Sequence, residues 1–188
     1  MATAILAVQG AFAEHAHMLR RLGEDAFELR QASDLARPFE RLVLPGGEST
    51  VQAKLLAEQC MLAPLRERIA GGMPVLATCA GLILLASAVH CDDPPRERRL
   101  ATFPMAAVRN AYGRQLGSFR AEVPFKGLGK VPATFIRAPQ IALLGEGAEA
   151  LSAHDGIIVA ARYGNQIACA FHPELDEDPR IHELFLPL

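Results

Sequence analysis

The sequence predicts a three-layer α/β fold, in which a mostly parallel central sheet carries helices on both faces and continues into an antiparallel extension. In the first half of the chain, continuous apolar runs of strand length alternate with helical stretches, which is typical of parallel strands buried on both faces. After about Ser87 the pattern changes to a series of strand-like segments. Because no linker, repeat or low-complexity tract divides the two parts, we expect residues 1–188 to form a single domain.

The first half contains four expected strands, separated by breaks that contain glycine. The strands are residues 3–8, 27–30, 41–44 and 74–78. The expected helices lie between them, at residues 11–22, from the capping residues 48–50 toward Cys60, and at residues 64–70. The breaks are residues 9–10, 45–47 and 71–72.

The second half begins with a polar, proline-rich segment, residues 91–99, which we expect to be a surface connection. The strand-like segments follow, at residues 106–109, 118–123, 133–137, 157–161 and 166–171. Residues 179–185 are expected to form a short closing helix.

Composition excludes several classes of protein. A chain of 188 residues can bury a full core without disulfides or a metal. The net charge of -2 gives no electrostatic reason to bind nucleic acid or an anionic membrane surface, and no apolar run reaches the ~20 residues that span a bilayer. The four cysteines show no C-x-x-C pairing, and no signal peptide precedes them. We therefore expect a cytoplasmic protein with reduced thiols and no zinc site.

A functional site is expected at one edge of the sheet. In sheets of this type, sites form outside the carboxyl ends of the strands, where the strand-to-helix turns gather. Three marked turns of this sequence fall at such ends, at residues 9–10, 45–49 and 78–81. The fold should bring these turns together.

Cys79 stands at one of these corners, within the run L-A-T-C-A-G-L-I-L-L of residues 76–85. A nucleophile on a strand-to-helix turn is held exposed on a tight bend and requires small neighbours, which Ala80 and Gly81 provide. The start of the following helix favours a thiolate, and its free N–H groups can stabilise an oxyanion. Alone, the pattern equally suits a small buried hydrophobic side chain, as many free cysteines are.

His172 is the candidate base, because it follows the last expected strand in C-A-F-H-P-E-L. Pro173 stiffens the turn, and Glu174 stands two residues on, where a carboxylate can fix the imidazole tautomer. The alternative is an ordinary surface turn. Among the other histidines, we expect surface or structural roles for His15, His17, His154 and His182.

The Gly46-Gly47 turn matches neither common phosphate-binding glycine motif. Two glycines allow a positive φ and a close approach of backbone N–H groups to a ligand, although an ordinary turn would also explain them.

Six sequence blocks resemble a known family. L-P-G-G-E-S-T (44–50), T-C-A-G-L (78–82) and F-H-P-E-L (171–175) resemble the three blocks of class I, triad-type glutamine amidotransferases, which have a flavodoxin-like fold. V-Q-G-A-F-A-E-H (8–15), R-N-A-Y-G-R-Q (109–115) and F-I-R-A-P (135–139) narrow the resemblance to the glutaminase subunits of pyridoxal 5'-phosphate synthase. Two segments, 100–108 and 176–188, depart from the family pattern.

The resemblance implies a role for each matching residue. Cys79 would be the nucleophile, His172 the general base and then acid, and Glu174 the group that orients His172. The implied glutamine-binding residues are Gly46, Gly47, Glu48, Arg109, Ile136 and Arg137, and the oxyanion hole would use the backbone N–H groups of Gly47 and Ala80. We further expect a partner to dock near Gln9, Glu14 and His15 and to correct a misoriented Gly46-Gly47 peptide.

The implied reaction is hydrolysis of L-glutamine to L-glutamate and ammonia through a glutamyl thioester, with no metal or organic cofactor. The implied partner is a (β/α)8-barrel pyridoxal 5'-phosphate synthase subunit that takes up the ammonia, with twelve copies of each subunit. Two alternatives remain at this point. One is another α/β hydrolase with a cysteine nucleophile, such as a peptidase or a deglycase, and the other is a non-catalytic redox-sensing or chaperone module.

Overall fold

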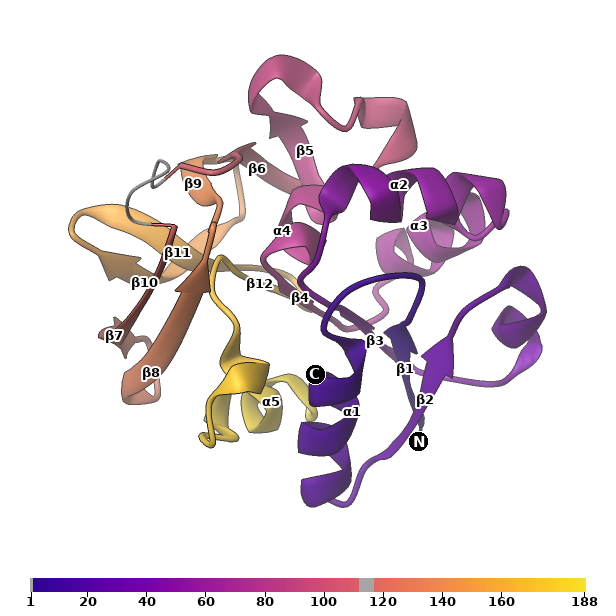
Figure 1. Ribbon diagram of the computed structural model, residues 1–188, viewed down its shortest axis with the longest axis horizontal. Coiled ribbons are helices and arrows are strands. Elements are labelled where there is room, and N and C mark those ends of the chain that lie inside the picture. Colours follow the sequence, from indigo (N-terminus) through magenta and orange to yellow (C-terminus); the bar gives the residue numbers. More distant parts are fainter. Residues whose placement is uncertain (1, 112–116) are drawn as a thin grey trace.

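The structure is a computed structural model that describes residues 2–111 and 117–188. Over these residues, one 12-stranded sheet runs through the molecule (Figure 1). Its parallel part consists of five neighbouring strands, in the order β2 (Asp25–Leu29), β1 (Ala2–Leu6), β3 (Arg41–Leu44), β4 (Val75–Thr78) and β12 (Gln166–Cys169). Every residue of β4 and β12 is buried, as the continuous apolar runs predict.

Helices cover both faces of this parallel part. On one face lie α1 (Phe12–Arg21) and α5 (Arg180–Phe185), and on the other lie α2 (Ser49–Glu58), α3 (Leu62–Ala70) and α4 (Ala80–Leu85) (Figure 1). The predicted three-layer arrangement is therefore confirmed.

The antiparallel extension begins where β11 (Ile157–Tyr163) pairs with β12. From there β10 (Glu149–His154), β7 (Ser118–Phe125) and β8 (Gly129–Ile136) continue to the edge of the sheet. A side branch joins β9 (Gln140–Leu144) to β11, β6 (Phe103–Val108) to β9, and β5 (Ala86–Val89) to β6. The described residues also form four 3-10 turns: η1 (Ala32–Ala36), η2 (His90–Asp92), η3 (Arg96–Arg98) and η4 (Pro173–Leu175).

Three strands, and burial within the segment 91–99, differ from the sequence expectation. The strands β5, β9 and β10 were not predicted, because β5 continues the apolar run of α4 and the other two are partly exposed, without a continuous apolar run. The segment 91–99 was predicted to be a surface connection, but Arg99 is fully buried at its end. Its guanidinium finds enough carbonyl and carboxylate acceptors to be buried, as described below.

Within residues 2–111 and 117–188, no helix has both the length and the apolar character needed to cross a membrane.

The parallel strands fix the position of the predicted turns. Because β1, β3, β4 and β12 run in the same direction, their carboxyl ends lie at one edge of the sheet. The residues that follow these ends are the turn at 9–10, the turn at 45–47, Cys79 and His172.

Candidate active site

Cys79 occupies a sharp corner between β4 and α4. Its φ of 47° and ψ of -101° lie outside the helical and strand regions, and its N–H donates to the Cys169 carbonyl at 2.8 Å. A Cβ on Gly81 would come within 2.1 Å of the Leu44 carbonyl oxygen. Glycine at position 81 therefore allows α4 to pack directly against β3, and this packing holds the corner in place.

Cys79 borders a cavity of about 230 Å³. Among the predicted site residues, those that line it with Cys79 are Gln9, Gly47, Glu48, Ala80, Arg109, Ile136, Arg137 and His172. The structure thus brings together residues from turns that are far apart in the sequence. The volume suits a small polar molecule rather than a folded protein segment.

His172 and Glu174 form a buried pair beside this cavity. The His172 Nδ1 lies 2.7 Å from Glu174 Oε1, and the backbone N–H of His172 donates to the Thr134 carbonyl at 2.8 Å. The ring interacts with the thiol of Cys79, which borders the same cavity and whose Sγ lies 3.9 Å from the Ile136 carbonyl oxygen. The three side chains are therefore connected in the order thiol, imidazole, carboxylate, which is the arrangement that nucleophilic catalysis requires.

The electrostatics of the pair favour a charged imidazole. Burial alone would lower the pKa of His172, but hydrogen bonds to Cys79 and Glu174, together with their negative charges, raise this pKa from 6.5 to about 10. Burial raises the pKa of Glu174, and its hydrogen bond to His172 opposes that increase. At neutral pH the imidazolium is therefore stabilised between the sulfur and the carboxylate.

The two glycines of the 45–47 turn are needed because of their neighbours. A Cβ on Gly46 would lie 2.2 Å from His172 Cε1, and one on Gly47 would lie 2.5 Å from Gln9 Oε1. Both glycines therefore lie in close contact with neighbouring side chains, whereas their close approach to a ligand stays a prediction. The expected positive φ is wrong, since neither residue adopts a left-handed conformation.

Hydrogen bonds hold this turn on three sides. The Gly46 N–H donates to Thr78 Oγ1 at 2.9 Å, and the Gly46 carbonyl accepts the Ala11 N–H at 3.0 Å. The Glu48 N–H donates to Gln9 Oε1 at 2.7 Å. The side chain of Glu48 caps α2 by accepting the Val51 N–H at 3.0 Å. Gln9 therefore supports the turn from within the same chain.

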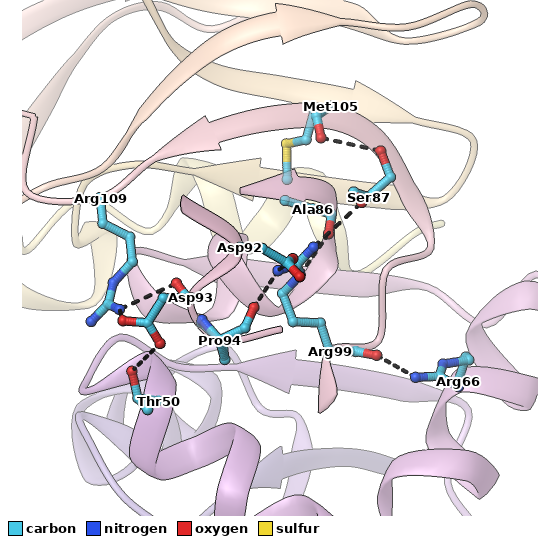
Figure 2. Close-up of polar contacts among 10 residues, drawn as sticks. All are labelled: Thr50, Arg66, Ala86, Ser87, Asp92, Asp93, Pro94, Arg99, Met105 and Arg109. Atoms are coloured by element: carbon cyan, nitrogen blue, oxygen red, sulfur yellow. Dashed lines mark hydrogen bonds and ion pairs between the residues drawn. The ribbon is translucent and has the colours of Figure 1, made fainter. Parts of the chain in front are cut away.

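Arg109 reaches the cavity between two carboxylates. Its Nη2 lies 2.8 Å from Glu48 Oε1, and its Nη1 donates to both the carboxylate and the carbonyl of Asp93 (Figure 2). Thr50 Oγ1 lies 3.4 Å from the other oxygen of Asp93. Two acidic groups thus fix the direction of the guanidinium.

Arg99 holds the turn that carries Asp93 (Figure 2). The fully buried guanidinium donates to the carbonyls of Ala86 and Pro94 and to Asp92 Oδ1 at 2.9 Å. Sequence reasoning missed Asp93 and Arg99, because only contacts between distant segments give them a role.

The three predicted partner contacts have different environments. Gln9 is partly exposed and Glu14 is exposed on α1, but His15 is fully buried. The expectation that His15 contacts a partner is therefore corrected, because its side chain lies inside the protein. The periodicity of α1 carries the signal for this burial, since Met18 and Leu19 lie three and four residues on and are also buried.

Part of one predicted motif, residues 112–115 of the block 109–115, lies outside the described residues. Within the described ranges, no group of three or more His, Cys, Asp or Glu side chains is arranged to hold a metal ion.

A model of the SNO glutamine amidotransferase family matches residues 5–187 of this chain. The chain belongs to the SNO glutamine amidotransferase family. This amidotransferase is 56% identical, over 99% of its length and 92% of the relative, to a protein of Desulfitobacterium hafniense named "Pyridoxal 5'-phosphate synthase subunit PdxT". A protein of the same name from Methanocorpusculum labreanum is 50% identical, over 100% of this chain and 97% of the relative.

Solved structures agree with this assignment. The amidotransferase superimposes on a structure titled "Crystal structure of glutamine amidotransferase" with a TM-score of 0.93 and 40% identity, covering 100% of this chain and 98% of the other. A structure described as a putative GMP synthase subunit shares the fold alone, with a TM-score of 0.70 at 17% identity over 100% of this chain and 92% of the other. The fold expected from the family resemblance, that of class I amidotransferases, is confirmed.

Proposed function

We propose that this amidotransferase hydrolyses L-glutamine to L-glutamate and ammonia, and that it supplies the ammonia to the synthase subunit of pyridoxal 5'-phosphate synthase in vitamin B6 synthesis. The main support is the connected series of Cys79, His172 and Glu174 at a cavity of about 230 Å³. Family membership and the names of relatives at 50% and 56% identity support the substrate and the pathway.

The first half of the reaction forms a thioester. The Cys79 thiolate attacks the side-chain amide carbon of glutamine, and the carbonyl oxygen becomes an oxyanion. We assign its stabilisation to the backbone N–H groups of Gly47 and Ala80, because both residues line the cavity beside Cys79. The His172 imidazolium then gives its proton to the leaving nitrogen, the C–N bond breaks, and ammonia departs.

The second half regenerates the enzyme. Neutral His172 takes a proton from water, and the resulting hydroxide attacks the thioester carbonyl. The C–S bond breaks, glutamate leaves, and the thiolate–imidazolium pair is restored. Glu174 holds the Nδ1 proton of His172 throughout and so keeps Nε2 directed at the reacting atoms.

The remaining cavity residues would bind the α-amino acid part of glutamine. Gly47 brings its backbone close to the substrate, with Gly46 beside it in the same turn, and Glu48 and Arg109 offer opposite charges that match the substrate's ammonium and carboxylate groups. Ile136 and Arg137 close the opposite wall, at the end of β8.

For the partner, we propose a (β/α)8-barrel synthase subunit in an assembly with twelve copies of each chain. The resemblance of the six sequence blocks supports this proposal. Docking near Gln9 and Glu14 would place the partner at the turn that Gln9 supports, and so next to the Gly46-Gly47 peptide.

The decisive experiment measures glutamate and ammonia release from glutamine, with and without saturating synthase. Equimolar release that disappears in Cys79→Ala and persists in Cys60→Ser would support the proposal. An electrophilic glutamine analogue should modify Cys79 alone. Cys60 and Cys91 are exposed but lie outside the cavity, and burial raises the pKa of the Cys169 thiol. Cleavage of peptides without glutamine turnover would refute the proposed glutaminase function.

A further inference from the structure

Two buried histidines lie behind the proposed triad, and the reaction described above uses neither. His15 on α1 and His182 on α5 are both fully buried. Their rings are in contact, with His15 Nδ1 at 3.0 Å from His182 Nε2. Two adjacent imidazoles in a protein interior require a defined arrangement of protons, because each N–H needs an acceptor.

The other nitrogen of His15 faces the triad. His15 Nε2 lies 3.4 Å from Glu174 Oε2 and 3.1 Å from Thr78 Oγ1. Glu174 uses its other oxygen, Oε1, to bind His172. Apart from this approach by His15, Glu174 Oε2 is buried with no hydrogen-bond partner among the described residues. A donor on His15 Nε2 would therefore complete the coordination of the carboxylate.

The surroundings decide which nitrogens carry protons. Burial lowers the pKa of His182 to about 4, and burial and the neighbouring histidines lower the pKa of His15, so both rings are neutral at pH 7. Each ring then has one N–H. If His15 were protonated on Nδ1, His182 would carry its proton on Nδ1, which is buried without a partner in the described structure. An unpaired buried donor destabilises the folded protein, so this arrangement is disfavoured.

The opposite arrangement leaves no unpaired donor. The His182 Nε2–H donates to His15 Nδ1, and the His15 Nε2–H is directed at Glu174 Oε2 and Thr78 Oγ1. The unpartnered His182 Nδ1 is then only a lone pair. This arrangement satisfies each ring N–H and gives Glu174 its second donor.

We propose that His15 is a positioning residue for glutamine hydrolysis, that its Nε2–H holds Glu174 and Thr78, and that His182 fixes its tautomer. Thr78 in turn accepts the Gly46 N–H at 2.9 Å. His15 therefore connects the carboxylate that orients the base with the turn assigned to the oxyanion. The inference rests on the proposed glutaminase function.

The kinetic test compares variants in complex with saturating synthase. His15→Leu removes the donor at similar volume, and kcat should fall about 10- to 100-fold, as expected for a hydrogen bond to a charged group, while KM changes little. His15→Gln restores an N–H near Nε2 and should recover much of the loss. His17→Leu, on the exposed face of the same helix, is the matched control and should retain full activity.

A double-mutant cycle separates positioning from general destabilisation. In a Glu174→Ala background, His15→Leu should have little further effect on kcat, because the group it positions is absent. Independent losses in the two variants would overturn the proposal, as would an unchanged kcat in a folded His15→Leu protein. A wild-type complex that releases no ammonia would instead refute the proposed function.

Nitrogen NMR of the wild-type protein gives a test that needs no variant. Long-range ¹H–¹⁵N spectra should show both His15 and His182 protonated on Nε2 at pH 7. A proton on His15 Nδ1 would overturn the inference whatever the activity of the complex.

Discussion

At the scale of single residues, the site depends on glycines, because the space left by their missing side chains is filled by neighbouring groups. The imidazole of His172 fills the space where a side chain at Gly46 would begin. Gly81 likewise leaves room for α4 to pack on β3 and so sets the direction of Cys79. These glycines are needed for close approach, and their substitution acts on the reacting groups directly.

We expect Gly46→Ala to displace the His172 ring and to lower kcat/KM at least about 100-fold, the effect of misplacing a catalytic group by an ångström. Gly47→Ala is the comparison variant and should lower kcat/KM less, because its Cβ would meet the end of the flexible Gln9 side chain at 2.5 Å. Glutamine turnover with saturating synthase measures both. Equal losses in the two variants would contradict this account of Gly46.

The pH dependence of turnover should show the pH at which the His172 imidazolium loses its proton. Its pKa is raised to about 10, so the proton needed by the leaving ammonia is present below that pH and lost above it. Glu174→Gln removes the negative charge beside the ring, and the alkaline limb of kcat should then move down by roughly 1 to 3 pH units. An alkaline limb at the same pH in both proteins would show that His172 does not control it.

At the scale of elements, the 91–99 segment acts as a support for the cavity. Arg99 anchors its turn to β5, and Asp93 at the tip contacts Arg109. A polar, proline-rich stretch of sequence thus holds Arg109, which lines the cavity.

Asp93→Ala should raise KM for glutamine while leaving kcat nearly unchanged, because Arg109 keeps Glu48 but loses its second anchor. Partly exposed ion pairs are weak, so we expect an increase of roughly 2- to 5-fold. Glu97→Ala removes the same charge from an exposed position of the same segment and serves as control. A fall in kcat at constant KM would indicate that Asp93 acts on the chemistry instead.

The parallel elements could be predicted from sequence because their burial on both faces produces continuous apolar runs. The expected strand 41–44 coincides with β3, and the other parallel strands differ only at their ends. The strands β9 and β10 carry no such signal, since buried and exposed residues do not form a continuous apolar run in them and their pairing is set by distant neighbours.

The site was predictable to the extent that its residues follow strand ends. Cys79, His172 and the 45–47 turn meet at one edge for that reason. Asp93 and Arg99 depend on contacts between segments that no local pattern reveals. The burial of His15 follows from helical periodicity, but its contacts with Glu174 and His182 do not.

At the scale of the whole molecule, the two helices on one face of the sheet bury a pair of neutral histidines. Burial lowers the pKa of His182 to about 4, whereas the unfolded chain titrates near 6.5. Between these values the unfolded state binds a proton that the folded state does not. The free energy of unfolding therefore decreases as the pH falls through this range.

We expect His182 alone to account for roughly 3 kcal/mol of this loss between pH 6.5 and pH 4. His182→Gln should flatten the dependence by that amount, even if it lowers stability at pH 7. Urea unfolding at several pH values measures the effect, with the exposed His17→Gln as control. The same slope in wild type and His182→Gln would show that His182 is not the group responsible.

The place of β12 in the sheet determines when the catalytic groups can meet during synthesis of the chain. This strand is the last in the chain, yet it lies in the interior of the sheet, between β4 and β11, and His172 lies three residues after its end. During translation Cys79 emerges from the ribosome well before its base. A nascent chain therefore holds a thiol with no imidazole beside it, and it gains hydrolytic capacity only when the final strand has inserted. Unfinished chains should consume no glutamine.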